Sequence, residues 1–144
     1  MKEFERLPPN SPIYEGLARF NAAIDKPHNP RALKRRLVVI ESPFAGDVAK
    51  NLEYARRCIK HSVERGEAPI ASHLLFTQDG IFDDNNPVER SQGIAAGLAW
   101  HRVADLVAFY IDRGISPGMT KAAEHARELG VKIEFRSLDR SFGP

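Results

Sequence analysis

The chain has 144 residues, 42% of them hydrophobic and 28% charged, which is typical of a single soluble globular domain with its own core. A net charge of +2 argues against a nucleic acid or an anionic membrane as the main partner. The single cysteine, Cys58, excludes a disulfide framework and a paired-cysteine metal site. No apolar run approaches about 18 residues and the first residues lack a signal-peptide core, so we expect a soluble protein of the reducing cytoplasm.

The first part of the chain is rich in proline, which brackets one segment able to form a short helix, YEGLARFNAAID. We predict an N-terminal arm over residues 1–36 that packs on the domain or on a neighbouring subunit, followed by the domain proper over residues 37–144. The arm ends in four cations between Arg31 and Arg36. These indicate either a solvated approach to the first strand or a contact with phosphate or nucleic acid.

The first strand and helix follow the arm directly. The continuous apolar run LVVIE, residues 37–41, predicts a strand covered on both faces. Apolar residues then recur every three or four positions from Val48 to Val63, which predicts a helix with Gly66 as its C-terminal cap. A second strand is predicted over PIASHLLFTQ, residues 69–78.

The second half of the chain repeats this alternation. Asn86 is followed by proline and, at the third helical position, by Glu89, a pattern that predicts a helix start with a capping box. The small residues of that helix suit close packing against a sheet. A strand over residues 104–112 leads to a helix that begins after Ser116, and an alternating strand over residues 131–138 is expected at a sheet edge.

The order β-α-β-α-β-α-β predicts one Rossmann-like α/β domain, with a parallel sheet of four to five strands and helices on both faces. In such a sheet every strand-to-helix loop lies at the carboxyl edge, where ligands bind. Three loops meet there, over residues 42–47, 77–87 and 112–119, and they hold most of the Gly, Asp and Ser that the strands exclude. The sequence therefore predicts a ligand site on this edge.

The first and third loops offer groups suited to an anion. The first supplies the Ser42 hydroxyl, the Phe44 ring and a helix start near Asp47 that could receive a phosphate or carboxylate, although Phe44 could equally pack in a plain connector. The third places Ser116 and Gly118 at a second helix start, where an ordinary N-cap serine is the alternative.

The middle loop is acidic. Asp79, Asp83 and Asp84 could orient a base or simply solvate the turn, and because their spacing fits no standard metal loop we expect no metal. Arg90 is free to reach this loop. His73 falls inside the predicted second strand and is interpreted as a core histidine. No Ser-His-Asp or Cys-His arrangement can be built from the spacings.

Several segments taken in order resemble a known family: SPFAGDVAKNLEYARR, GEAPIASHLLFTQ, NPVERSQGIAAGLAW, YIDRGISPGM and EFRSL. They are similar to a domain of unknown function common in phages and prophages and described as nucleoside 2-deoxyribosyltransferase-like. The resemblance covers about residues 37–138. It implies a pocket for a nucleoside or nucleotide, no cofactor, a homo-oligomer and, for a phage-encoded protein, the cytoplasm of a bacterial host.

True nucleoside deoxyribosyltransferases and nucleotide N-glycosidases are more distantly similar. Their small-residue–Pro–Phe turn corresponds to residues 42–44, and the aspartate before their Ser-Gly loop corresponds to Asp112. Their nucleophilic glutamate, four residues after the glycine of that loop, falls on Ala122. The nearest carboxylate, Glu124, lies about 200° further round a helix.

This departure leaves catalysis open, because the covalent mechanism needs a carboxylate at the anomeric carbon. We expect either an enzyme acting on the N-glycosidic bond or a non-catalytic binder or sensor of a nucleotide-derived metabolite. A DNA-associated protein is a third, weaker expectation. The predicted catalytic candidates are Asp112 and Glu124. The predicted ligand-binding residues are Ser42, Pro43, Phe44, Asp47, Asp83, Asp84, Arg90, Ser116, Gly118 and Met119.

Overall fold

The computed structural model describes residues 12, 15–16, 19 and 35–139, and the chain divides into two units, residues 1–34 and 35–144. The described positions of the first unit are helical. The remainder of the predicted arm lies outside the described residues, and so do residues 31–34 of the basic segment. The account below therefore concerns the second unit.

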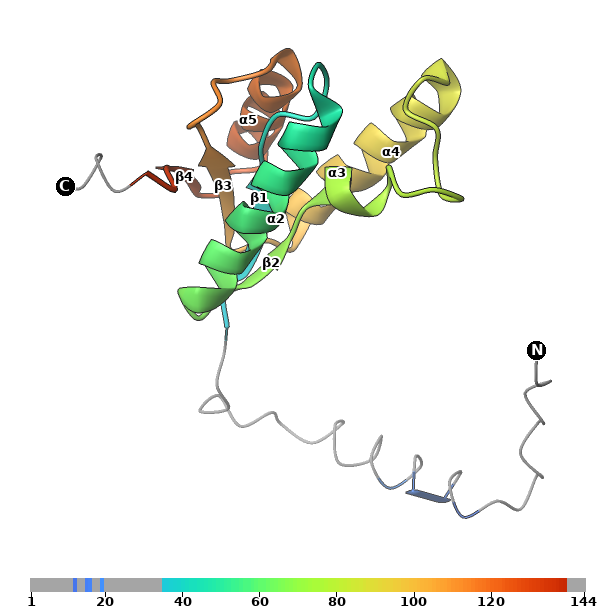
Figure 1. Cartoon of the computed structure of the whole chain (residues 1–144). Helices are drawn as coiled ribbons and strands as arrows, with labels where there is room; N and C mark the ends of the chain where they lie inside the picture. The colour runs from blue at the N-terminus through green and yellow to red at the C-terminus, as the bar shows by residue number, and fades with distance from the viewer. Residues whose placement is uncertain (1–11, 13–14, 17–18, 20–34, 140–144) are drawn as a thin grey trace. The chain divides into compact units, whose positions relative to one another are not determined.

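Four parallel strands form one sheet in the order β2-β1-β3-β4 (Figure 1). The strands are β1 (Leu37–Glu41), β2 (Ala68–Ile70), β3 (Leu106–Tyr110) and β4 (Ile133–Arg136). In register, Val39 pairs with Ile70 on one side and with Val107 on the other. The chain thus leaves β1 toward one edge and returns to β3 on the opposite side. This reversal opens a crevice at the carboxyl ends of β1 and β3, where ligands of open α/β sheets bind.

Helices cover both faces of the sheet, as predicted. They are α2 (Val48–Glu64), α3 (Ser72–Leu75), α4 (Pro87–Ala99), the short 3₁₀ helix η1 (Trp100–Arg102) and α5 (Pro117–Glu128). Alternate residues of β1 face opposite layers, because successive strand side chains point to opposite faces. Ile40 packs in one core cluster with Tyr54 of α2, and Val39 packs in another with Ala126 of α5. The predicted Rossmann-like α/β fold is confirmed.

The second strand is much shorter than predicted. Strand β2 ends at Ile70, and the segment from Ser72 to Leu75 forms the helix α3 instead. A short apolar run such as HLLF fits a strand and a buried helix equally well, so periodicity alone could not separate them. As a result His73 lies on a helix beside the carboxyl edge of the sheet, and the prediction that it belongs to a core strand is wrong.

Helix α4 packs against α3. A Cβ atom added at Gly97 would lie 2.5 Å from Ser72 Oγ, so the two helices approach each other as closely as glycine allows. Gly97, one of the small residues of α4, therefore serves this helix–helix contact. Gly97 is the only residue of α4 that is buried.

A buried ion pair joins the start of β2 to the end of β4 beneath α2. Arg136 donates to both carboxylate oxygens of Glu67, at 2.7 and 2.8 Å, and the two residues are 6% and 3% exposed. Ser62 and Arg36 also donate to Glu67. Burial acts to raise the pKa of Glu67, but the hydrogen bonds from Arg136, Ser62 and Arg36 lower it to about 2. Arg36 of the basic segment thus has a structural partner.

Candidate functional site

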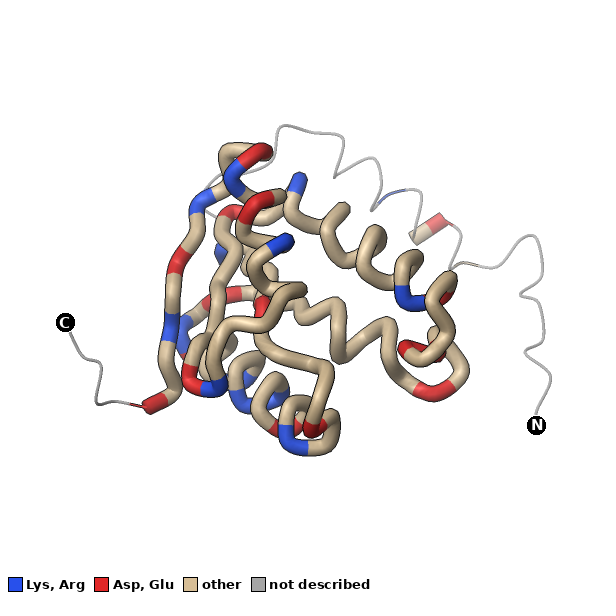
Figure 2. Tube along the Cα trace, turned by 90° about the horizontal axis from the view of Figure 1, so that it is seen from above, with Lys and Arg blue, Asp and Glu red and all other residues tan. Residues whose placement is uncertain are grey.

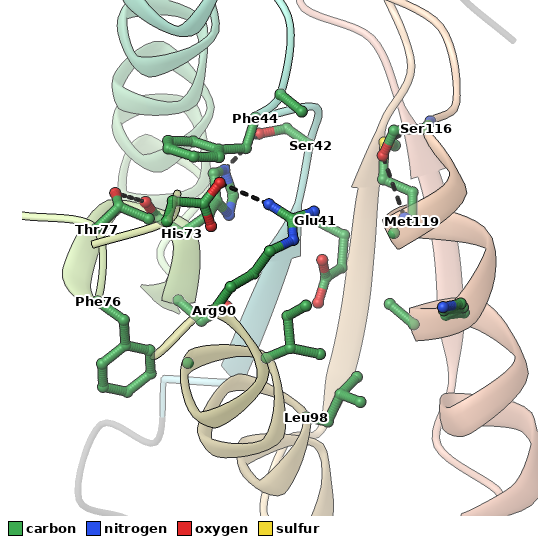
Figure 3. Close-up of a pocket in the computed structure, with 18 of the residues that line it drawn as sticks. Glu41, Ser42, Phe44, His73, Phe76, Thr77, Arg90, Leu98, Ser116 and Met119 are labelled. Carbon is green, nitrogen blue, oxygen red and sulfur yellow. Dashed lines mark hydrogen bonds and ion pairs between the residues drawn. The ribbon is translucent and has the colours of Figure 1, made fainter. Parts of the chain in front are cut away.

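A pocket of about 420 Å³ opens at the carboxyl edge of the sheet, where the reversal of strand order predicts a ligand site (Figure 3). Its walls come from the end of β1, from α3 and the loop after it, from α4 and from the first turns of α5. The volume lies within the range of about 300–1,000 Å³ that small-molecule sites occupy.

The walls of the pocket are largely apolar. Phe44 follows β1, and Phe76 and Phe82 come from the segment after α3, with ring centroids 6.3 Å apart. Leu98 of α4 and Met119 of α5 close other sides. Three phenylalanine rings around one cavity provide flat apolar surfaces against which a planar group can stack.

One polar wall is formed by Ser42 and His73. Ser42 Oγ and His73 Nε2 lie 2.8 Å apart and form a hydrogen bond, drawn as a dashed line in Figure 3. Burial lowers the pKa of His73, only partly opposed by the charge of Glu41, so the imidazole is neutral at pH 7. Residue 43 is proline and has no N–H to stabilise an oxyanion beside Ser42. The pair therefore supplies neutral hydrogen-bonding groups rather than a serine-hydrolase site.

The Ser42–His73 contact was missed from the sequence, because His73 was assigned to a core strand. The sequence signal for this contact is the short polar stretch at the start of α3, directly after an apolar strand. This stretch indicates a side chain near the carboxyl edge only when the segment is a helix and not a continuation of the strand.

An ion pair crosses another part of the pocket. Arg90 Nη1 lies 2.5 Å from Asp84 Oδ2, and both side chains line the cavity. Glu89 also lines it, but its carboxylate accepts from the backbone N–H of Asp83 at 2.5 Å. The predicted capping box of Glu89 with Asn86 is therefore not the contact it makes, although Asn86 does cap α4. Arg90 reaches the loop as predicted.

The start of α5 forms the facing wall. Ser116 caps the helix, and its Oγ accepts from the backbone N–H of Met119 at 3.2 Å while the residue also lines the pocket. Gly118 does not adopt a positive φ, and a Cβ added there would meet only Ser116 Oγ, at 3.8 Å. The position is thus open toward the cavity.

A further carboxylate in the pocket was not predicted. Glu41, the last residue of β1, lines the cavity, and its Oε1 lies 3.2 Å from Nε2 of the buried His101. Glu41 is the last residue of the predicted first strand, a position that indicates no functional role.

Seven of the predicted ligand-binding residues line this pocket: Ser42, Phe44, Asp84, Arg90, Ser116, Gly118 and Met119. The other three do not. Pro43 is buried, Asp47 caps α2 by accepting from the backbone of Lys50, and Asp83 accepts from Asn85.

The two catalytic candidates also lie outside the pocket lining. Asp112 accepts hydrogen bonds from Tyr54, from Ser137 and from the backbone of Leu138 and Asp139. Burial opposes ionisation of Asp112, but the bonds from Ser137, Tyr54 and the backbone hold its pKa well below the usual range. Glu124 is exposed on α5, whereas Ala122 is buried and does line the pocket.

Charge on the domain is mixed. Figure 2 shows basic and acidic residues interspersed along the chain rather than gathered on single faces. No group of three His, Cys, Asp or Glu side chains in the described part of the chain could hold a metal ion. Across those same residues, no helix is both long and apolar enough to span a bilayer.

Fold and site together define a Rossmann-like α/β domain with a largely apolar pocket at its carboxyl edge. The chain belongs to the family described as domain of unknown function DUF7768, whose family model matches residues 36–136. The match includes every strand and helix of the sheet domain and thus all the walls of the pocket. No curated protein matches the chain.

Proposed function

We propose that the pocket binds a nucleoside- or nucleotide-type small molecule. The observation that carries the proposal is the combination of three phenylalanine rings with an arginine in one cavity at the sheet's carboxyl edge. A nucleotide presents a planar base and an anionic group, and these are the two kinds of group that this lining suits. The resemblance of the loops to nucleoside 2-deoxyribosyltransferase-like domains points to the same class of ligand.

The cavity suggests a role for each wall. Phe44, Phe76 and Phe82 would contact the base. Arg90 and the start of α5 would receive the phosphate, since a helix start and a guanidinium both favour negative charge. For this the phosphate must compete with Asp84, whose carboxylate is paired with Arg90.

Binding is favoured over cleavage by the side chain at position 122. Ala122 lines the cavity at the position that corresponds to the nucleophilic glutamate of the transferases. A methyl group cannot attack an anomeric carbon, so we expect a non-catalytic binder or sensor of a nucleotide-derived metabolite. N-glycosidase or deoxyribosyltransferase activity is the second candidate, and the carboxylate of Glu41 in the same cavity favours it.

Calorimetry and thermal shift with a panel of ribonucleoside and deoxyribonucleoside 5′-monophosphates test the proposal. We expect at least one nucleotide to bind and stabilise the wild-type protein. The Arg90→Gln substitution should weaken the affinity for that nucleotide about tenfold or more, because a charged hydrogen bond is lost. Arg102→Gln is the matched control, since Arg102 is an exposed cation of η1 outside the pocket lining. Absence of binding by the whole panel would contradict the proposal.

Chromatography of the same incubations separates the two candidates. Slow or absent release of free base supports a binder. Rapid release that survives Asp112→Asn but disappears in Glu124→Gln would restore a glutamate of α5 as nucleophile and contradict the placement of Glu124 on the exposed side of the helix.

We also propose that the chain forms a homo-oligomer, most simply a dimer. Helix α4 and the residues after it expose several large apolar side chains: Val88, Ile94, Trp100 and Val103. Such residues on one element are suited to a subunit contact. Light scattering at micromolar concentration tests this, and a mass of 16.1 kDa, that of one chain, would count against it.

A further inference from the structure

Glu41 stands out among the pocket carboxylates by its burial and its support. Its side chain is only 13% exposed, and the imidazole that contacts it, His101, is 0% exposed. Figure 3 shows Glu41 projecting from the end of β1 on the same side as Arg90. Asp84, by comparison, is 30% exposed and is held by a partly exposed arginine.

A second histidine, which is half-buried, packs against the first. The rings of His101 and His125 have centroids 5.4 Å apart, and His125 comes from α5, three residues after Ala122. Among the described residues, His101 Nδ1 and His125 Nε2 are the buried side-chain polar atoms that have no hydrogen-bond partner. Buried polar atoms are nearly always paired, so two on adjacent rings call for a joint explanation.

Donor and acceptor rules give that explanation. A carboxylate only accepts, so Nε2 of His101 must donate to Glu41. In a neutral imidazole the other nitrogen, Nδ1, is then an acceptor. Nε2 of His125 is the other unpaired atom, and with its proton there it would be a donor. The ring of His125 contacts that of His101, and His101 in turn contacts Glu41, which lines the pocket.

We propose that Glu41 is the ligand-binding carboxylate of the pocket, that it accepts a hydrogen bond from a hydroxyl of the ligand's sugar, and that His101 and His125 are its positioning residues. This rests on the proposed nucleotide-type ligand. A carboxylate repels phosphate but accepts readily from a hydroxyl, and α/β folds commonly use an acidic side chain at a strand end to bind a ribose hydroxyl. Arg90 would then bind the anionic group of the ligand, and Glu41 would accept a hydrogen bond from one of its hydroxyl groups.

The position of Ala122 agrees with this division. Its small side chain lines the cavity in the α5 turn before His125 and leaves Glu41 as the carboxylate with buried support there. Glu41 would therefore bind the sugar, a role that the resemblance to the transferases does not assign to this position.

The test compares affinities of adenosine, guanosine, cytidine and uridine 5′-monophosphates with those of their 2′-deoxy and 3′-deoxy counterparts. The proteins are wild type, Glu41→Gln and the control Glu128→Gln, whose carboxylate is exposed on α5 and outside the pocket lining. We expect Glu41→Gln to weaken the best-bound ribonucleotide about tenfold to a hundredfold. The ratio of the affinity for the ribonucleotide to that for its 2′-deoxy or its 3′-deoxy counterpart should decrease in Glu41→Gln and stay unchanged in the control.

Nitrogen NMR of the histidines tests the positioning residues without any ligand. We expect both His101 and His125 to carry a proton on Nε2. A proton on Nδ1 of His101 with none on Nε2 would overturn the proposed positioning role, because that tautomer cannot donate to Glu41 through Nε2.

The outcomes are separable. If no nucleotide binds wild type, the proposed function fails and this inference with it. If nucleotides bind but Glu41→Gln matches Glu128→Gln in affinity and in discrimination, only the role of Glu41 fails and the pocket assignment stands.

Discussion

Two sets of polar side chains, one beneath α2 and one around the pocket at the carboxyl edge of the sheet, differ in how far their hydrogen-bonding capacity is used within the fold. Beneath α2, Glu67 receives Arg136, Ser62 and Arg36, and nearby Tyr110 contacts both Arg136 and His61. On the pocket side, Glu41, Ser42, His73 and Arg90 each have one polar side-chain contact and also face the cavity.

The difference separates structural from functional polarity. A buried charged group surrounded by donors is already satisfied, so it stabilises the fold and has little capacity left for a ligand. Asp112 is exposed, but donors already occupy its carboxylate in the same way, although its place after β3 suggested catalysis. Glu41 belongs to the second kind, although its place inside a strand suggested nothing.

Among the substitutions that test this difference between structural and functional polar groups, Glu67→Gln is expected to have the largest effect. The substitution leaves the buried Arg136 guanidinium with only the partly exposed Glu134 as counter-charge, so we expect a loss of about 3–5 kcal/mol in the free energy of unfolding. Urea denaturation measures it. Glu64→Gln, which alters a largely exposed ion pair with Lys60, should change stability by less than about 0.5 kcal/mol. Equal losses in the two variants would contradict a buried network.

The second largest effect is expected from acid, which should remove the contribution of Glu67 to the free energy of unfolding. A carboxyl whose pKa is lowered on folding stabilises the protein above its unfolded pKa, and that stability is lost as the pH falls through the folded pKa. For Glu67 these values are 4.5 and about 2. We expect wild-type stability to decline between about pH 4.5 and 2, more steeply than that of Glu67→Gln, by urea denaturation at several pH values. Parallel curves would show that other carboxyl groups cause the decline.

Gly118→Val tests the pocket side. The branched side chain would project where we propose that an anion meets the start of α5, so we expect at least a tenfold loss of nucleotide affinity by calorimetry. Stability should change little, because the backbone φ is ordinary and the nearest atom is 3.8 Å away. Unchanged affinity for a nucleotide that binds wild type would remove this wall from the site.

The smallest effect is expected for Asp112→Asn. Its hydrogen bonds tie the segment after β4 to β3, but the residue is exposed, and solvent screening limits the loss to about 1 kcal/mol in unfolding free energy. Nucleotide affinity should match wild type. A selective loss of binding or of base release in this variant would instead assign Asp112 to the functional side.

The sequence by itself determined the architecture and the edge that carries the pocket. Continuous apolar runs defined β1 and β3, the caps at Asn86 and Ser116 defined the starts of α4 and α5, and parallel topology then brought the loops together. These features depend on local propensity and on the shared direction of parallel strands, which short segments encode. For this reason seven predicted residues do line one cavity.

Only the tertiary structure decided which side chains face that cavity with capacity left for a ligand. The conversion of the expected second strand into α3 brought His73 to Ser42, and the contact of Glu41 with His101 joins residues 60 positions apart in the sequence. Likewise, the carboxylate of Asp112 accepts a hydrogen bond from Tyr54, 58 positions away in the sequence, and is not part of the pocket lining. Hydrogen bonds between distant segments follow from packing, and no periodicity or spacing within a single segment records which partner a polar side chain will meet.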